Sequence, residues 1–550
     1  MHLRKLWLFA GAVLLALALT ATGSAKVTTG GPASQDAKKG GTIVFGAEQG
    51  GGPDWCLNQI LVNDCGEFWN SVFLTPVLRG AFLIQPNFTY KPDIISKYTL
   101  KLNPMRITYY IRKNAQWSDK VPVTGKDFIF GWKTIMDPKL KDHVSTQGYD
   151  QIQSIKGNGK VVKVTFAKPF ADWKDLFGGG VVLPAHALAG ADMLTVWTDN
   201  VVNPKTGKPI GNGPYLETAF DRGSGITLTR NPTKWHGPRA KADRIVFKFL
   251  TNTNTEIQQI RGGEVDAIYP QPQQALSELS GQSGLRIQSN LGTTWEHIDI
   301  QQGPKGNPLA KNLWARQALM LSLDRASTVK ALFGQLNPRL RPLNNAVFVT
   351  NHPAYKPHWA KWTFNRNKAE QILTAHGCAK GADGIFRCGG TKLSFQFEST
   401  RGNKLRELSF TIFQDQAKQA GIELLNNFKP AGTYFGQDLP NHNYDLALFA
   451  WVGSPDPAGS VEIWKCNGAQ NYMEYCNQKV TSLLEKTDVT LDPAKRFALF
   501  NQADALMAND IPTIPLYQKP TYFVYKAGIK GMKDNATNQG PTWNAEAWSQ

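Results

Sequence analysis

The sequence predicts a mixed fold of the α/β or α+β class, because strand-like and helix-like segments interleave along the chain. Three segments, residues 106–112, 243–250 and 392–398, alternate hydrophobic and polar side chains as half-buried strands do. Residues 315–333 instead repeat apolar side chains every three or four positions, which indicates an amphipathic helix. A second helical segment, 406–421, ends at a glycine that can cap it and leads into a strand-like stretch.

The N-terminus has the three-part pattern of a secretory signal, predicted here as residues 1–25. Two basic residues precede an apolar run, 6–19, and the small residues Gly23 and Ala25 follow at a plausible cleavage site. As a helix the run would span roughly 21 Å, less than the ~30 Å core of a bilayer. An uncleaved membrane anchor is the alternative. The following residues, 26–39, are rich in glycine and lysine and are predicted to form a flexible leader.

No cysteine follows the apolar run, so the sequence does not indicate a lipid-anchored protein. We therefore expect export to the periplasm or to the outer face of the cytoplasmic membrane. The chain has 550 residues, of which 41% are hydrophobic and 19% charged, which is ordinary for a globular protein of two to four domains.

The formal net charge is +18, or +16 once Arg4 and Lys5 leave with the signal. Lysine and arginine are spread through the chain in short runs, and no RNP, zinc-finger or basic-helix pattern accompanies them. A solvated basic surface is therefore favoured over binding to nucleic acid or another polyanion, and no nucleic-acid partner is expected.

The cysteines form three near-neighbour pairs, which in an exported chain predicts three disulfides that each close a short loop. The predicted pairs are Cys56–Cys65, Cys378–Cys388 and Cys466–Cys476. Metal binding is the alternative, but zinc sites use closer spacing, and only His376 lies beside a cysteine pair. No metal is expected.

The sequence does not indicate an enzyme. It contains no GxSxG, HExxH, P-loop or GxGxxG motif in a strand–turn–helix segment. His376 and Cys378 suggest a Cys–His pair, but a cysteine held in a disulfide cannot act as a nucleophile. No cofactor is expected. A secreted chaperone or a structural surface protein remains an alternative class.

Six motifs occur in an order that resembles a known family. They are GGTIVFGAE (40–48) with FLTPVLRG (73–80), IRKNAQWSDKVPVTGKDFIFGWKTIMDP (111–138), GNGPYLETAF (211–220), NPLAKNLWARQALMLSLDR (307–325), YDLALFAWVGSPDP (444–457) and AKRFALFNQADALMANDIPTIPLYQKP (494–520). Together they resemble the solute-binding proteins of peptide and nickel ABC importers, family 5, of the oligopeptide and dipeptide type. The resemblance covers nearly the whole mature chain.

The resemblance implies a class II periplasmic-binding-protein-like fold, in which two hinged α/β lobes close over a ligand and an extra lobe packs on the first. Lobe I would comprise residues 40–78, 203–282 and 505–550, the extra lobe II residues 79–202, and the closing lobe III residues 283–504. It also implies a monomer that captures a peptide-like solute and passes it to an ABC permease and, through it, to ATPase subunits.

Family members bind peptides as an added strand between lobes, so backbone groups carry much of the recognition. The ligand-contacting positions that the resemblance implies are Asn63, Asp64, Cys65, Trp451, Gly453, Ser454, Asp456, Tyr472 and Tyr475. Trp451 and Tyr475 are the favoured side-chain contacts, because planar aromatic rings offer contact area at low entropic cost. For Trp451, a place in the hydrophobic core is the alternative.

The loop WVGSPDP departs from the family pattern. Relatives carry a sequence similar to WtgDyxDP, whose first aspartate holds the α-ammonium of the ligand, whereas Gly453 and Ser454 stand at that place here. Asp456 corresponds to the later acidic residue, which favours a turn. A peptide is the leading ligand class, and an amidated or blocked peptide, or a non-peptide solute such as a glycoconjugate, is the alternative.

Overall fold

The computed structural model describes residues 40–48, 50–52, 55–65 and 68–550. The predicted signal peptide (1–25) and leader (26–39) lie outside these described residues. Within the described ranges, none of the helices combines the length and the apolar character that a membrane span requires.

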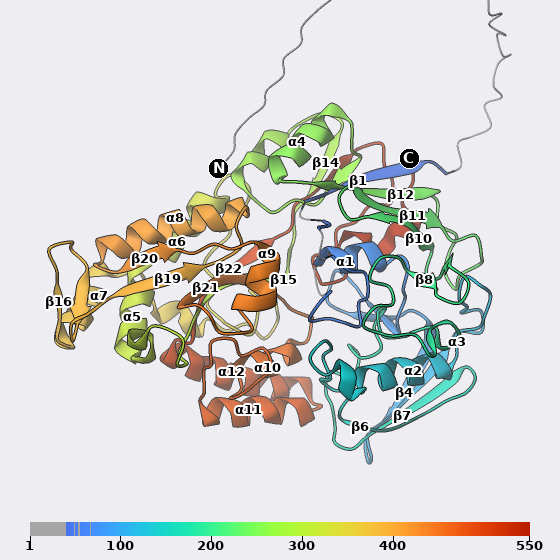
Figure 1. Ribbon diagram of the computed structural model, residues 1–550, viewed down its shortest axis with the longest axis horizontal. Helices are drawn as coiled ribbons and strands as arrows, with labels where there is room; N and C mark the ends of the chain where they lie inside the picture. The colour runs from blue at the N-terminus through green and yellow to red at the C-terminus, as the bar shows by residue number, and fades with distance from the viewer. Residues whose placement is uncertain (1–39, 49, 53–54, 66–67) are drawn as a thin grey trace, which may run out of the picture. The chain divides into compact units, whose positions relative to one another are not determined.

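A seven-stranded mixed sheet forms the first α/β layer (Figure 1). In spatial order its strands are β10 (Tyr215–Asp221), β11 (Gly225–Arg230), β12 (Arg244–Leu250), β1 (Thr42–Glu48), β13 (Ala267–Ile268), β23 (Phe523–Lys526) and β14 (Leu285–Gln288). β1 pairs in parallel with β12 and β13. Phe45 on β1 is fully buried, and its ring lies 5.4 Å from Phe247 and 5.9 Å from Phe523. These aromatic contacts join the strands β1, β12 and β23 within the hydrophobic core.

A five-stranded sheet forms the second layer. In spatial order its strands are β20 (Glu423–Asn426), β19 (Ser394–Glu398), β21 (Leu446–Val452), β15 (Leu291–Ile300) and β22 (Thr513–Pro520). The helices that accompany it are α5 (Leu313–Ser322), α6 (Arg325–Phe333), α7 (Arg366–Ala375), α8 (Lys404–Gln419), α11 (Gln478–Val489) and α12 (Pro493–Asp510). Phe410 on α8 packs against Phe397 on β19, with 5.1 Å between ring centroids.

The extra segment contains a four-stranded antiparallel sheet of β4 (Ile95–Lys101), β5 (Arg106–Ile111), β7 (Val161–Phe166) and β6 (Ile152–Lys156). α2 (Gly125–Ile135) lies against β6 and β7, as Figure 1 shows. Its Phe128 ring lies 5.8 Å from the ring of Tyr109 on β5, so this face of the sheet is part of the hydrophobic core.

The remaining helices and strands, most of them short, connect or flank these sheets. They are α1 (Phe68–Leu74), β2 (Phe82–Ile84), β3 (Tyr90–Pro92), α3 (Ala185–Leu188), β8 (Val202–Asn203), β9 (Lys208–Pro209), α4 (Thr253–Gly262), β16 (Cys378–Lys380), β17 (Phe386–Cys388), β18 (Thr391–Lys392), α9 (Ala431–Thr433) and α10 (Ser460–Trp464). The chain is therefore a mixed α/β protein, as predicted, and the three alternating segments are the strands β5, β12 and β19.

The helix predicted over residues 315–333 is interrupted at one point. Leu323 has an extended backbone, and the Asp324 side chain accepts a hydrogen bond from the backbone N–H of Ser327 at 3.0 Å. Because an aspartate that caps a new helix competes with continuation of the old one, the segment forms two helices, α5 and α6.

The chain crosses between the two large sheets at two places, after Gln288 and after Pro520. β14 pairs with β23 in the seven-stranded sheet, and β22 pairs with β15 in the five-stranded sheet. The lobe boundaries predicted from the sequence, at residues 283 and 505, each precede one of these crossings. Each strand belongs to the sheet in which its backbone hydrogen bonds are formed. A family motif does not show where the chain passes from one sheet to the other.

Candidate ligand-binding site

The carboxyl ends of strands from the two large sheets face one another. On the first sheet, β1 ends at Glu48 and β13 is followed by Gln271; on the second, β21 ends at Val452. Lys519 near the end of β22 donates a hydrogen bond to the Gln271 side chain, and its Nζ lies 3.5 Å from Glu296 Oε1. Ligands of open α/β sheets bind outside the carboxyl ends of the strands, so this contact marks the candidate site.

Two buried carboxyl groups form the first-sheet side. Thr253 Oγ1 donates to Glu48 Oε2 at 2.5 Å, and the backbone N–H of Gln271 donates to the same oxygen at 3.1 Å. The backbone N–H of Glu48 donates to Glu256 Oε1 at 3.1 Å. Burial, and next the charge of Glu48, raises the pKa of Glu256 well above its ordinary value. Burial also raises the pKa of Glu48, although the hydrogen bonds from Thr253 and Gln271 oppose that shift.

A buried ion pair forms the second-sheet side. Arg406 Nε and Nη2 each lie 3.2 Å from an oxygen of Glu296, and Arg406 Nη1 donates to Thr400 Oγ1 at 2.9 Å. Burial opposes the charged form of Glu296, but the charges of Arg406 and Lys519 outweigh it and lower the pKa of that carboxyl. We call Glu296, Arg406 and Lys519 the floor of the site. These residues carry opposite charges that compensate one another.

Trp451 and Tyr472 form an aromatic stack on the face of the second sheet opposite Glu296, because Trp451 pairs with Trp295 of β15 and consecutive residues of a strand point to opposite faces. Their ring centroids are 5.9 Å apart with planes inclined by 15°, and both side chains are half-buried. Trp451 also stacks on His297 at 6.1 Å. Because both rings are only half-buried, part of the stack borders solvent.

Below the stack, β15 carries a polar pair that sequence reasoning missed. His297 Nε2 lies 3.4 Å from Asp299 Oδ1, and both residues are fully buried. Among the described residues, neither side chain has a hydrogen-bond partner. The sequence shows that Trp295, His297 and Asp299 alternate along one face of this strand, although it does not show what lies against that face.

The loop that follows β21 is held by side chains of β15 and α12 and by its own Ser454. Thr293 Oγ1 donates to the carbonyl oxygen of Gly453 at 2.5 Å, and Ser454 Oγ donates to the carbonyl oxygen of Asp456 at 2.5 Å. The Asp456 carboxylate forms an ion pair with Arg496 of α12. Asp456 is therefore engaged within the second layer, which agrees with a structural role for this residue.

Carboxylates from the extra segment reach the same loop, and sequence reasoning missed them as well. Burial raises the pKa of Asp175, and Tyr90 and Ser454 oppose this shift. Burial raises the pKa of Asp456 to about 6, with Arg496 opposing the shift and Asp175 adding to it. Nearby, the backbone N–H of Ala171 donates to the carbonyl oxygen of Asp488 at 2.8 Å. The sequence holds no motif that brings these segments together.

Asn63 and Asp64 lie against a different part of the molecule. Asn63 Nδ2 donates to the carbonyl oxygen of Asp142 at 2.9 Å, and Asp64 Oδ2 lies 2.7 Å from His143 Nδ1. Both contacts are with the extra segment, whereas Trp451 and Tyr472 belong to the second layer. The structure thus does not bring Asn63 and Asp64 together with the predicted aromatic contacts.

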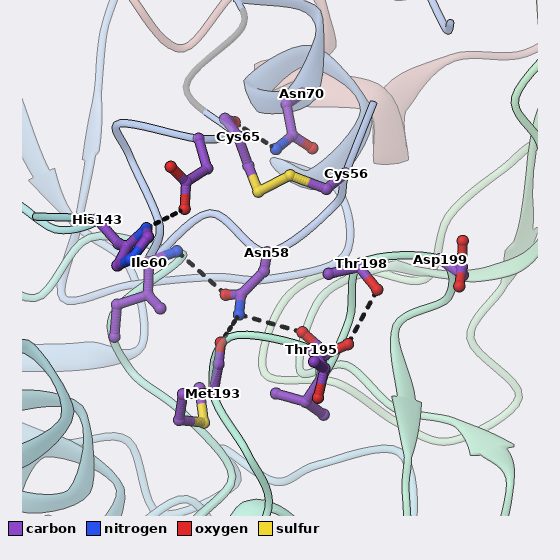
Figure 2. Close-up of a disulfide and its surroundings, with 12 residues drawn as sticks. Cys56, Asn58, Ile60, Cys65, Asn70, His143, Met193, Thr195, Thr198 and Asp199 are labelled. Carbon is purple, nitrogen blue, oxygen red and sulfur yellow. Dashed lines mark hydrogen bonds and ion pairs between the residues drawn. A yellow bond between two sulfur atoms is a disulfide. The ribbon is translucent and has the colours of Figure 1, made fainter. Parts of the chain in front are cut away.

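Cys65 lines a cavity of about 230 Å³ that also contacts Arg79, Asp93 and Asp175. A disulfide joins Cys65 to Cys56, and Asn70 Nδ2 donates to the carbonyl oxygen of Cys65 at 2.7 Å, as Figure 2 shows. The other two disulfides are Cys378–Cys388 and Cys466–Cys476, so the structure has the three pairs expected from spacing.

Tyr475 differs from its predicted role. Its side chain is 3% exposed, it belongs to the hydrophobic core of the second layer, and its hydroxyl lies 2.5 Å from Asp510 Oδ2. The adjacent Cys466–Cys476 disulfide fixes the loop that carries it. A tyrosine held in this way has almost no surface to offer to a ligand.

The family model described as Bacterial extracellular solute-binding proteins, family 5 Middle, matches residues 89–472. The oligopeptide-binding protein OppA of Mycobacterium tuberculosis is 27% identical over 486 residues, which cover 86% of this chain and 79% of that protein. OppA of Bacillus subtilis is 24% identical over 485 residues, covering 83% and 85%.

Two solved structures share the fold. The periplasmic EDTA-binding protein EppA superposes with a TM-score of 0.83 at 24% identity, covering 93% of this chain and 96% of that chain. The oligopeptide-binding protein AppA from Bacillus subtilis, in complex with a nonapeptide, gives a TM-score of 0.78 at 22% identity and covers 93% and 99%.

Proposed function

Because the chain belongs to the bacterial extracellular solute-binding proteins of family 5, we propose that it captures a peptide or peptide-like solute and delivers it to an ABC importer. It acts as a binding component without catalysis, outside the cytoplasmic membrane, and its partners are the permease and, through the permease, the ATPase subunits. The contact between Lys519 and Gln271 carries the proposal, because it locates the facing strand ends at which such a fold binds its ligand.

The two large sheets are proposed to be the cores of two lobes that close on the ligand, with residues 79–202 as the extra lobe. The two crossings, after Gln288 and after Pro520, support this division, because they are the only strand exchanges between the sheets within the described residues. Rotation about two neighbouring connections is the movement expected of a hinge.

Backbone pairing and aromatic contact are proposed to hold the ligand. The end of β21 beyond Trp451 offers backbone groups, and the Trp451–Tyr472 stack offers a planar surface. The charged groups of the floor already pair with one another, so they supply no unpaired charge for a ligand terminus. A blocked peptide or a glycoconjugate therefore remains the alternative to a free peptide.

Native mass spectrometry of the freshly purified protein identifies any solute that co-purifies, and calorimetry then measures its affinity. Trp451→Ala should weaken binding more than about tenfold, about 1.4 kcal/mol. Trp314→Ala is the matched control, because Trp314 is also half-buried but stacks on His376 of the second layer. A bound solute that is turned over, or equal losses from the two variants, would contradict the proposal.

A further inference from the structure

The outer face of the extra sheet is strongly basic. Residues paired across β4, β5, β7 and β6 lie on the same side of the sheet, and they form two rows. One row is Thr99, Thr108, Lys163 and Lys156; the other is Lys101, Arg106, Thr165 and Ser154. With Lys97, which pairs with Tyr110, the face carries five exposed cations and no carboxylate on these four strands. We call this surface the basic face.

The opposite side of the same sheet is buried. Ile107, Tyr109, Val162 and Val164 are fully buried, and α2 packs over them. Of the described elements, none covers the basic face, since its cations are all exposed. In Figure 1, β4, β6 and β7 lie at one edge of the ribbon with α2 on one side of them. The sheet therefore has one face for the fold and one that is available to a partner.

The arrangement of cations on the basic face destabilises the sheet, so stability of the fold does not explain it. Lys101 pairs directly with Arg106, and Lys156 pairs directly with Lys163. Like charges directly opposite each other on neighbouring strands destabilise a sheet. Within the described residues, none of the five cations forms an ion pair; Arg106 Nε hydrogen-bonds to Thr165 Oγ1 at 3.4 Å, and Lys97 lies over the Tyr110 ring. An anionic partner would relieve this repulsion.

Apolar side chains beside the cations identify the kind of anionic partner. Leu102, in the turn between β4 and β5, is 50% exposed. Val161, which pairs with Tyr110 on the basic face itself, is 40% exposed. A planar array of cations flanked by exposed aliphatic groups suits the headgroup region of a bilayer, where both charge attraction and apolar insertion contribute. The leader, residues 26–39, is not the anionic partner of the basic face, because its three lysines and one aspartate give it a positive net charge.

We propose that the basic face docks on an anionic phospholipid bilayer, so that the protein stays close to the membrane that holds its permease. Each basic residue at such a surface adds attraction that falls off within a Debye length. Binding should therefore be reversible and should weaken as salt is raised.

Co-flotation of the full chain with vesicles tests the proposal. The vesicles are phosphatidylcholine alone, or phosphatidylcholine with phosphatidylglycerol as about one third of the lipid. Binding is expected only to the anionic vesicles. Neutralising Lys156 and Lys163 together with glutamine should lower partitioning about 25-fold, about fivefold for each charge. Leu102→Ser should lower it severalfold without changing the charge.

The matched control neutralises two exposed lysines of the second layer, Lys330→Gln with Lys368→Gln, which removes the same net charge. It should leave partitioning within about twofold of the original protein. Equal losses from the two double variants would overturn the proposal, because binding would then follow net charge. A second result would also overturn the proposal: the protein binds soluble polyphosphate as tightly as vesicles, and Leu102→Ser has no effect. The partner would then be a soluble polyanion and not a bilayer. Unchanged thermal midpoints confirm that the variants are folded.

Discussion

Replacing Arg406 with methionine should destabilise the protein strongly, because it leaves Glu296 buried without its main partner. Glu296 is fully buried and Arg406 is 7% exposed, and two of the Arg406 nitrogens lie 3.2 Å from the carboxylate. Breaking a buried pair by removing one partner costs about 3–5 kcal/mol. Lys519 remains 3.5 Å away, so we expect the lower end, about 3 kcal/mol.

Urea denaturation without added ligand measures this loss, and Lys404→Met is the control. Lys404 lies on the same helix and pairs with Glu407, but its side chain is 66% exposed, so its removal should cost about 0–1 kcal/mol. Adding Glu296→Gln to Arg406→Met should recover part of the stability, because a neutral amide needs no counter-charge. A loss from Arg406→Met no larger than that from Lys404→Met would refute the reasoning.

The same variant has a pH dependence of known sign. In the original protein, burial acts to raise the pKa of Glu296, but the charge of Arg406 outweighs burial, so the pKa is lowered. A lowered carboxyl pKa stabilises the fold above the unfolded pKa, about 4.3, and this contribution is lost as the pH falls through the folded pKa. In Arg406→Met, burial instead raises the pKa, and Glu296 takes up a proton as the pH falls. The stability gap between the two proteins should therefore narrow between about pH 7 and pH 4.

Three further predictions concern the covalent frame, the hinge and the ligand. Peptide mapping without reductant should recover the three near-neighbour disulfides, and free thiols or bridges between distant cysteines would contradict the pairing. Small-angle scattering should show a smaller radius of gyration when a tight ligand is bound, whereas an unchanged radius would contradict a hinge. N-acetylation of a bound peptide should cost less than about tenfold in affinity, because Asp456 is engaged by Arg496 and Ser454 is uncharged. A hundredfold loss that Asp456→Asn reproduces, roughly 2.8 kcal/mol, would show that Asp456 anchors the ligand ammonium instead.

The sequence by itself determined the class of the fold and the local structure of many segments. Alternation placed Ile107, Tyr109 and Ile111 on the buried side of β5, because the side chains of a strand point to opposite faces in turn. The spacing of the cysteines was also sufficient, since bridges that close short loops depend mainly on local chain geometry. The break between α5 and α6 was missed, because the capping tendency of Asp324 competes with a strong helical periodicity.

Tertiary structure alone decided which residues meet. Lys519 and Gln271 are 248 residues apart in sequence, and Glu296 and Arg406 are 110 apart, yet each pair is in contact. The position of Tyr475 in the sequence predicted a ligand contact, but in the folded protein its side chain packs in the hydrophobic core. Local periodicity reports which face of an element is buried and is silent on what lies against it. Contacts between distant segments depend instead on how the sheets pack and on where the chain crosses between them, and this is why the place of Asp175 near the loop after β21 emerged only from the folded protein.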